Sequence, residues 1–312
     1  MSGSAVVFGS VHMDVIARAA ALPDRGESIS GGTFSMAPGG KGGNQAVQLA
    51  LNGVATSIVT RVGADVFGRA LLDALRSKGV ETDRVIVDPD HPTGASVVLA
   101  DAGDYASIIA PGAAAELRRE DLEAARDRIA AADAALIQWE LPTAIVAETV
   151  AFCADLGVTV VFNASPVTER AAALPGTFWA PIDWLVVNRF EADRLLGFDS
   201  GRTLTVAEIA SRLRDELGIA NVLITLGAEG SYWLGPSGFA FQPALPAQVV
   251  DTVGAGDAFL GTFVATLIQR QSIPLALRRG AAAGALAVGR SGAYDAMPAN
   301  VEIDGFLLSR DR

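Results

Sequence analysis

Cysteine and histidine are scarce in this chain of 312 residues, which contains one cysteine and two histidines. A single cysteine excludes an intrachain disulfide and is typical of proteins from a reducing compartment, so we expect a cytoplasmic location. Cys153 lies in an apolar run with helical spacing. That setting favours a small buried residue over a reactive thiol.

Long apolar runs and an excess of positive charge are also missing. No stretch of about 18 uncharged apolar residues occurs, the N-terminus lacks a basic region, and Asp14 interrupts the first apolar run. We therefore expect neither a membrane span nor a signal peptide. Lys and Arg number 24 against 35 Asp and Glu, a formal net charge of −11. This balance argues against nucleic-acid binding through a basic surface.

Apolar residues, by contrast, are abundant. They make up 50% of the chain, enough to bury a large core in a single α/β domain over residues 1–312. Repeated strand–helix–strand units predict a mainly parallel sheet with helices on both faces. Expected strands are 5–9, 56–62, 134–138, 158–162, 184–187 and 222–225; expected helices are 44–51, 65–78, 119–132, 142–156, 189–196, 205–217, 258–269 and 274–288.

The alternation of strands and helices stops between residues 85 and 110. Three short strands are expected there, at 85–87, 95–100 and 105–110, with turn signals and no helix between them. Together with the segment near 11–35, they predict a small separate sheet. We expect the segments at approximately 11–35 and 93–110 to form a lid over the body. Because a small exposed sheet needs cover, we also expect a homodimer through the lid.

Polar residues follow one expected strand after another: Asp14, Glu140, Asn163, Asn188 and Thr225. In a sheet of parallel strands the carboxyl ends share one edge, and ligands bind there. The sequence therefore predicts one cleft that gathers carboxylates, amides and glycine-rich loops.

The stretch 251–257 (DTVGAGD) has small residues where a strongly amphipathic helix is expected to begin. Small residues let the backbone N–H groups of a helix N-terminus face an anion. A carboxylate beside such a site is explained if a phosphoryl group binds the N–H groups while Asp257 takes a proton from an attacking hydroxyl. The alternative is that Asp257 caps the helix, since Asp is common at that position.

A second glycine-rich stretch, 38–44 (PGGKGGN), also precedes an expected helix. Four glycines within five residues indicate a close backbone approach or positive φ angles. A P-loop is excluded because Lys41 is followed by Gly42 rather than by Ser or Thr. A dinucleotide fingerprint is excluded because no Gly-x-Gly-x-x-Gly follows the first strand directly, which disfavours a nicotinamide-dependent dehydrogenase.

Residues 39–46 (GGKGGNQA) and 251–257, in this order, resemble the two signature motifs of the PfkB family of carbohydrate kinases, which have the ribokinase-like fold. The resemblance extends from Val6 to Pro298. It implies an ATP-dependent sugar kinase with Mg²⁺ as cofactor that phosphorylates a primary hydroxyl, with ribose to ribose 5-phosphate as the first candidate. A nucleoside or another sugar is the alternative substrate. A non-catalytic protein that binds a sugar or nucleotide is the rival from another class.

The resemblance also implies roles for particular residues. Asp257 would be the general base, and the N–H groups of Gly254, Ala255 and Gly256 would form an anion hole. The implied sugar-binding residues are His12, Asp14, Gly40, Lys41, Gly42, Gly43, Asn44, Glu140 and Asp257. The implied nucleotide-binding residues are Asn188, Glu191, Thr225, Leu226, Gly227, Ala228, Glu229, Gly230 and Gly256. Of these, Asn188 and Glu191 would organise Mg²⁺ and the phosphates.

Two positions depart from the family pattern. His12 stands where the family usually has Asn beside the sugar, which leaves the identity of the sugar open. The implied ligands of a monovalent cation, K⁺, are Asp251 and the carbonyl groups near Val253, Ala287, Arg290 and Gly292. Ala296 stands where a hydroxyl ligand is expected, so one ligand of that cation is missing.

Overall fold

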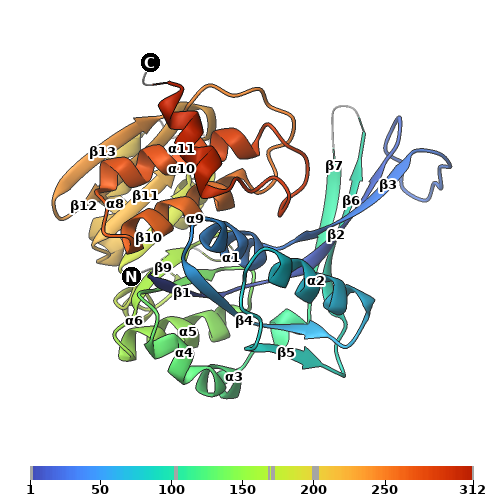
Figure 1. Cartoon of the computed structure of the whole chain (residues 1–312), viewed down its shortest axis with the longest axis horizontal. Helices are drawn as coiled ribbons and strands as arrows, with labels where there is room; N and C mark the ends of the chain where they lie inside the picture. Colours follow the sequence, from blue (N-terminus) through green and yellow to red (C-terminus); the bar gives the residue numbers. More distant parts are fainter. Residues whose placement is uncertain (1–2, 102–104, 168, 170–172, 199–203, 311–312) are drawn as a thin grey trace.

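The computed structural model describes residues 3–101, 105–167, 169, 173–198 and 204–310, and it contains two β-sheets. Figure 1 shows a body built on the larger sheet, with the smaller sheet standing out from it. The expected architecture is confirmed, because the large sheet is mostly parallel and has helices packed on both faces.

The large sheet has nine strands in the described part of the chain, in the order β13-β12-β11-β10-β9-β8-β1-β4-β5. Neighbours from β5 to β11 are parallel, whereas β12 and β13 run antiparallel at one edge. The bounds are β1 Ser4–Phe8, β4 Ala55–Gly63, β5 Val85–Asp88, β8 Ala134–Gln138, β9 Thr159–Asn163, β10 Trp184–Asn188, β11 Asn221–Thr225, β12 Gly230–Gly235 and β13 Gly238–Pro243. The carboxyl ends of the parallel strands therefore lie along one edge of the sheet.

Successive side chains of a strand point to opposite faces, so each buried strand feeds two core layers. In β1, Val6 and Phe8 belong to one buried cluster, and Ala5 and Val7 belong to the other. The first cluster is covered by α3 Arg119–Ala124, α4 Arg126–Ala130, α5 Thr143–Asp155, α6 Gly176–Trp179, α7 Arg189–Leu195 and α8 Val206–Leu217. The second is covered by α1 Lys41–Leu51, α2 Val66–Ser77, α9 Ala255–Ile268, α10 Ile273–Ala287 and α11 Asn300–Leu308.

None of the helices in the described ranges combines the length and the apolar character needed to cross a bilayer. The single helix expected at 119–132 is wrong in detail, because the chain turns at Ala125 and divides it into α3 and α4.

The small sheet has the order β3-β2-β6-β7, with bounds β2 His12–Arg18, β3 Thr33–Gly39, β6 Thr93–Ala100 and β7 Tyr105–Gly112. The strands β2 and β6 are parallel, and the two outer pairings are antiparallel. The first of the three short strands expected from the sequence, at 85–87, was wrongly assigned to this sheet. It is β5, which pairs with residues 60–63 of β4 at the edge of the large sheet. A short apolar strand does not reveal in sequence which sheet edge it will join.

The helix α9 begins three residues earlier than the sequence predicted, at Ala255, and its N-cap is Gly254. Gly254 has φ 74°, a left-handed conformation that glycine adopts without steric cost. Asp257 therefore lies inside the first turn. The interpretation of Asp257 as the cap of this helix is wrong.

A buried ion-pair network joins β4, β5 and α3 at the base of the small sheet. The guanidinium of Arg61 donates to Asp121 at 2.8 and 2.9 Å and to Asp88 at 2.9 Å. All three side chains are buried. Removing the cation from such a group leaves two buried carboxylates without a counter-charge, which is strongly destabilising.

We therefore expect Arg61→Met to lower the midpoint of urea unfolding by about 1 M or more. The control is Arg76→Met, which removes an exposed pair with Asp73 at 3.4 Å and an exposed hydrogen bond to Thr82 at 2.8 Å and should leave the midpoint nearly unchanged. Circular dichroism during urea titration measures both. Equal midpoints for the two variants would contradict a stabilising role for the Arg61 network.

Candidate active site

The carboxylate of Asp257 is held between two carboxamides. Asn44 Nδ2 donates to Asp257 Oδ2 at 2.8 Å, and Gln45 Nε2 donates to Oδ1 at 2.8 Å. Both amides come from the start of α1, where Asn44 and Gln45 are its fourth and fifth residues, and Asp257 comes from the first turn of α9. Asp257 is only 6% exposed. Each carboxylate oxygen retains a further lone pair, so the group is oriented and able to accept a proton.

The start of α9 provides a site for an anion beside this carboxylate. The first N–H groups of a helix have no intrahelical acceptor and carry a partial positive charge. Ala255 N–H makes only a long 3.3 Å bond to the carbonyl of Thr252, and a Cβ added to Gly256 would meet no atom within 4 Å. Of the anion hole expected at Gly254, Ala255 and Gly256, the backbone of Gly256 thus faces open space, whereas a Cβ on Gly254 would lie 3.1 Å from Met297 Cε.

The loop before α1 lies against the end of β1. Gly40 caps α1 with φ 92°, and a Cβ there would lie 2.5 Å from the carbonyl oxygen of Ser10. A Cβ on Gly43 would lie 1.8 Å from the hydroxyl of Tyr294, whose Oη donates to Gly39 O at 3.3 Å. Glycine is therefore required for close packing at this loop.

Lys41 brings positive charge into a group of carboxylates. Its backbone N–H donates to Glu140 Oε2 at 2.9 Å, and Ser10 Oγ donates to the same oxygen. Burial lowers the pKa of the Lys41 ammonium, but the charges of Asp257, Glu140 and Glu191 outweigh it and raise the pKa above its usual value. Lys41 therefore stays cationic near neutral pH.

His12 and Asp14 reach the same region from β2, the first strand of the small sheet. His12 Nε2 lies 3.2 Å from Asp14 Oδ1. Burial lowers the pKa of His12, but the hydrogen bond to Asp14 and the charges of Glu140 and Asp14 more than offset it, so the pKa is raised. Nδ1 of His12 is buried and has no hydrogen-bond partner among the described residues.

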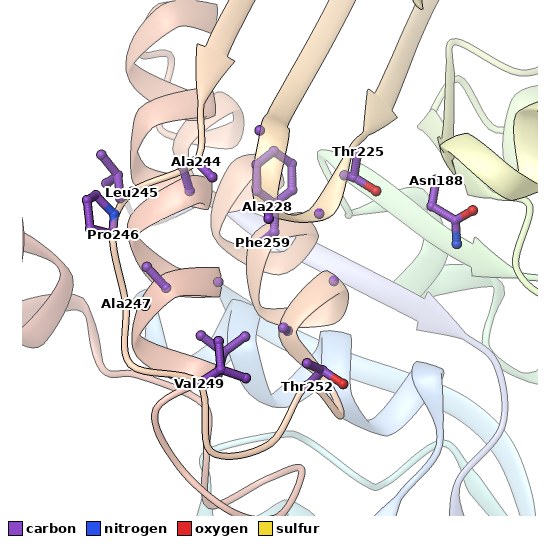
Figure 2. A pocket seen from close by; sticks show the side chains of 18 residues that line it. Asn188, Thr225, Ala228, Ala244, Leu245, Pro246, Ala247, Val249, Thr252 and Phe259 are labelled. Atoms are coloured by element: carbon purple, nitrogen blue, oxygen red, sulfur yellow. The ribbon is translucent and has the colours of Figure 1, made fainter. Parts of the chain in front are cut away.

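A cavity of about 740 Å³ adjoins the start of α9 (Figure 2). Six of the residues expected at the nucleotide line it: Asn188, Thr225, Gly227, Ala228, Gly230 and Gly256. The other three expected residues, Glu191, Leu226 and Glu229, are not among its lining residues, and Leu226 instead packs against the core. Figure 2 shows Thr225 and Asn188 facing the apolar segment 244–249 across the cavity.

Sequence reasoning missed the apolar wall of this cavity, which consists of Ala244, Leu245, Pro246, Ala247, Val249, Phe259, Ala281, Gly284, Ala285 and Val288. It also missed Gln45, Tyr294 and Ser10. Apolar residues of a loop and two helices carry no signal that separates a cavity wall from a core.

Asn188 and Glu191 form a reciprocal cap at the start of α7. Asn188 Oδ1 accepts the N–H of Glu191 at 2.8 Å, and Glu191 Oε2 accepts the N–H of Asn188 at 2.8 Å. The Asn-x-x-Glu pattern thus has a structural role in ending β10 and starting α7. Asn188 also lines the cavity, whereas Glu191 does not, so the cap presents the carboxamide of Asn188 to it.

The residues expected at a monovalent cation come from two adjoining segments. Asp251 Oδ1 accepts the N–H of Val253 at 3.1 Å, and Asp251 N–H donates to the carbonyl of Val288 at 3.1 Å. The carbonyl of Ala287 accepts the N–H of Arg290 at 3.0 Å, and Gly292 follows with φ 87°. The described residues contain no cluster of three or more His, Cys, Asp or Glu side chains suited to a metal.

Comparison with known proteins identifies the family. A model of the pfkB family carbohydrate kinases matches residues 2–300. The chain belongs to this family. It is 30% identical to a ribokinase of Haemophilus influenzae, over 98% of this chain and 99% of the relative. A deoxyribokinase of Salmonella typhi is 28% identical, over 96% of this chain and 97% of the relative.

The solved structures agree. Arabidopsis thaliana ribokinase, in complex with ribose and ATP, matches with a TM-score of 0.89 and 31% identity, over 98% of this chain and 99% of that one. The family resemblance and the ribokinase-like fold are confirmed, and the protein is a carbohydrate kinase. The motif at 251–257 thus belongs to a phosphotransferase.

The raised pKa of His12 predicts a pH-dependent contribution to the stability of this kinase. A histidine whose pKa rises on folding stabilises the fold below its unfolded pKa of about 6.5. That contribution disappears as the pH increases through the higher folded pKa. The difference in unfolding free energy between the native chain and His12→Asn should therefore be largest near pH 5 and shrink toward alkaline pH.

Urea unfolding across this pH range measures the difference. The control is the same comparison made in the Asp14→Asn variant, which lacks the carboxylate that accepts from His12. In that variant, the effect of His12→Asn on the unfolding free energy should lose most of its pH dependence. A difference that stays constant with pH would show that His12 is not held in its charged form.

Proposed function

We propose that this kinase transfers the γ-phosphoryl group of ATP to the O5 hydroxyl of ribose, with Asp257 as the general base. The observation that carries the proposal is the position of Asp257. Its carboxylate is oriented by Asn44 and Gln45, and it follows directly on Gly256, which lines the cavity. The ribokinase relatives, one of them in complex with ribose and ATP, support these two substrates.

Unpartnered buried atoms support a polyhydroxyl ligand. Asn44 Oδ1 and His12 Nδ1 are both buried without a partner among the described residues. A buried polar atom without a hydrogen bond is costly, so such atoms are expected to bind a ligand. Asp14, Glu140 and Lys41 add charged groups that can bind sugar hydroxyls in the same place.

The chemistry follows from the placement of these groups. Asp257 accepts the proton as the sugar oxygen attacks the γ-phosphorus, and the bond from phosphorus to the ADP oxygen breaks. The N–H groups at the start of α9 bind the charge that collects on the equatorial phosphoryl oxygens. The apolar wall at 244–249 and Phe259 offers contact area for the nucleotide base.

Glu191 and Asn188 fit the requirements of Mg²⁺, which prefers oxygen ligands and keeps several waters. They are the residues that would hold it, and when bound the ion neutralises phosphate charge.

Asp251 and the neighbouring carbonyls supply oxygen ligands suited to K⁺, but Ala296 is buried and has no side-chain oxygen. We therefore assign K⁺ a site with fewer ligands than the family pattern provides.

The substrate is tested by ADP release from Mg-ATP with ribose, deoxyribose, fructose, adenosine and pseudouridine, each with and without K⁺. We expect the highest kcat/KM with ribose. His12 and the deoxyribokinase relative make deoxyribose the second candidate.

Asp257→Asn should lower kcat by about 10²–10⁴-fold while nucleotide binding survives. Normal turnover by this variant would contradict the mechanism, and tight sugar binding without ADP would indicate a non-catalytic protein.

We further propose that the small sheet is a lid and that its outer face pairs with a second copy. Met36, Val97 and Ile108 lie in one cross-strand row, with Phe34 and Leu99 in the next row on the same face. These five side chains are 39–76% exposed. Asp14, one residue away from Val15 of the first row, lies on the opposite face, which carries the proposed sugar-binding groups. A contiguous apolar face of this kind favours burial against an identical sheet.

Val97→Glu should therefore convert a homodimer into a monomer, because it places a charge inside the proposed interface. The matched control is Val87→Glu, since Val87 is 50% exposed and Val97 47% exposed, but Val87 lies on β5 of the large sheet. Light scattering at micromolar concentration measures the mass. A monomeric native chain, or equal effects of the two substitutions, would contradict this interface.

A further inference from the structure

A chain of buried carboxamides lies behind the carboxylate of Asp257. Gln45 and Gln138 are fully buried, and Asn163 is 9% exposed. They come from three different elements, α1, β8 and β9. Gln45 Nε2 donates to Asp257 Oδ1 at 2.8 Å and to Asn163 Oδ1 at 3.0 Å, and its Oε1 accepts from Gln138 Nε2 at 2.6 Å.

These bonds hold the amide of Gln45 in one orientation. Asn163 Nδ2 donates to the carbonyl of Val186 at 3.0 Å, which turns its Oδ1 toward Gln45. A flipped Gln45 would place its carbonyl oxygen against two acceptors, Asp257 Oδ1 and Asn163 Oδ1, and its NH₂ group against the donor of Gln138. The carboxylate therefore always meets an N–H from this side.

The far end of the chain is held by packing. A Cβ added to Gly9 would lie 1.8 Å from Gln138 Oε1. The absence of a side chain at Gly9 thus leaves the space that Gln138 occupies at the carboxyl end of β1. Strands β1, β8 and β9 are neighbours in the large sheet, so the chain of amides connects Asp257 to the rigid centre of the fold.

We propose that Gln45 is a positioning residue for the phosphoryl transfer, which sets the plane of the Asp257 carboxylate through the Gln138 and Asn163 contacts. This inference rests on the proposed role of Asp257 as the base. With Gln45 bound to Oδ1 and Asn44 to Oδ2, the carboxylate cannot rotate without breaking both bonds. A free lone pair then faces the attacking hydroxyl in each turnover, and small displacements from such a geometry reduce rates by about 10²-fold.

The test is Gln45→Met, which keeps the length of the side chain and removes its amide. The matched control is Gln48→Met, one turn later on the same helix. Gln48 is equally buried, and its Nε2 donates to Thr262 of α9 and to the carbonyl of Pro298, both at 3.0 Å, without touching Asp257. Both substitutions should lower the urea midpoint by similar amounts. Only Gln45→Met should lower kcat, by about 10–100-fold, with the KM values for sugar and ATP nearly unchanged.

Gln45→Glu is the second variant, because it is isosteric. It places a second carboxylate against Asp257, and two carboxylates in contact cannot both ionise. The acid limb of its kcat–pH profile should move up by about one pH unit or more, whereas a purely structural role would leave the limb in place. Equal losses of kcat in Gln45→Met and Gln48→Met, or an unmoved acid limb in Gln45→Glu, would overturn the inference.

The same assay separates this inference from the proposed function. Normal turnover by Asp257→Asn would show that Asp257 is not the general base, and the mechanism under the proposed function would be rejected. Loss of turnover in Asp257→Asn, combined with normal turnover in Gln45→Met, leaves the base in place and rejects only the positioning role of Gln45.

Discussion

The meeting of two helix N-termini, α1 and α9, at the carboxylate of Asp257 is the contact on which the rest of the site depends. Asn44 and Gln45 donate to its two oxygens, and the same arrangement brings the glycine-rich loop of α1 opposite the open amides of α9. The two helices can approach this closely because Gly261 of α9 has no side chain, and a Cβ there would lie 2.6 Å from Cβ of Gln48 on α1. Small residues thus allow the two helices to approach, and the carboxamides of Asn44 and Gln45 fix the position of the Asp257 carboxylate.

Much of this arrangement could be predicted from local sequence. The alternation of buried strands and helices predicted the parallel sheet. The polar residues at the strand ends predicted one cleft at its carboxyl edge, and of these Asn188 and Thr225 line the cavity. The motif 251–257 predicted a helix N-terminus beside a carboxylate, and only the start of the helix was placed three residues too late. That error mattered for Asp257, because a residue of the first turn can face a substrate while a cap is occupied by its own helix.

Other features depend on contacts between residues far apart in the chain. The amide of Gln45 meets Asn163 across 118 positions and Asp257 across 212, and no periodicity or propensity encodes such a pairing. The apolar wall at 244–249 and the place of β5 in the large sheet could not be predicted for the same reason. An apolar residue packs against whichever elements the fold brings near it, and local sequence does not show which these are. Arg61 shows the same dependence on distant contacts for a charged residue, because its two carboxylate partners, Asp88 and Asp121, follow it by 27 and 60 positions.

The charge balance of the site explains why carboxamides rather than cations contact the Asp257 carboxylate. Asp257, Glu140 and Glu191 all raise the pKa of Lys41, so one ammonium faces three carboxylates before any phosphate arrives. An anionic substrate would be repelled by this set unless backbone N–H groups and bound cations supply positive potential. Uncharged carboxamides can orient Asp257 without neutralising it, which a lysine or arginine in the place of Gln45 would do. The proposed base must gain a proton during the reaction, so it is better held by uncharged groups that do not stabilise its ionised form as a cation would, and the buried amide chain meets that condition.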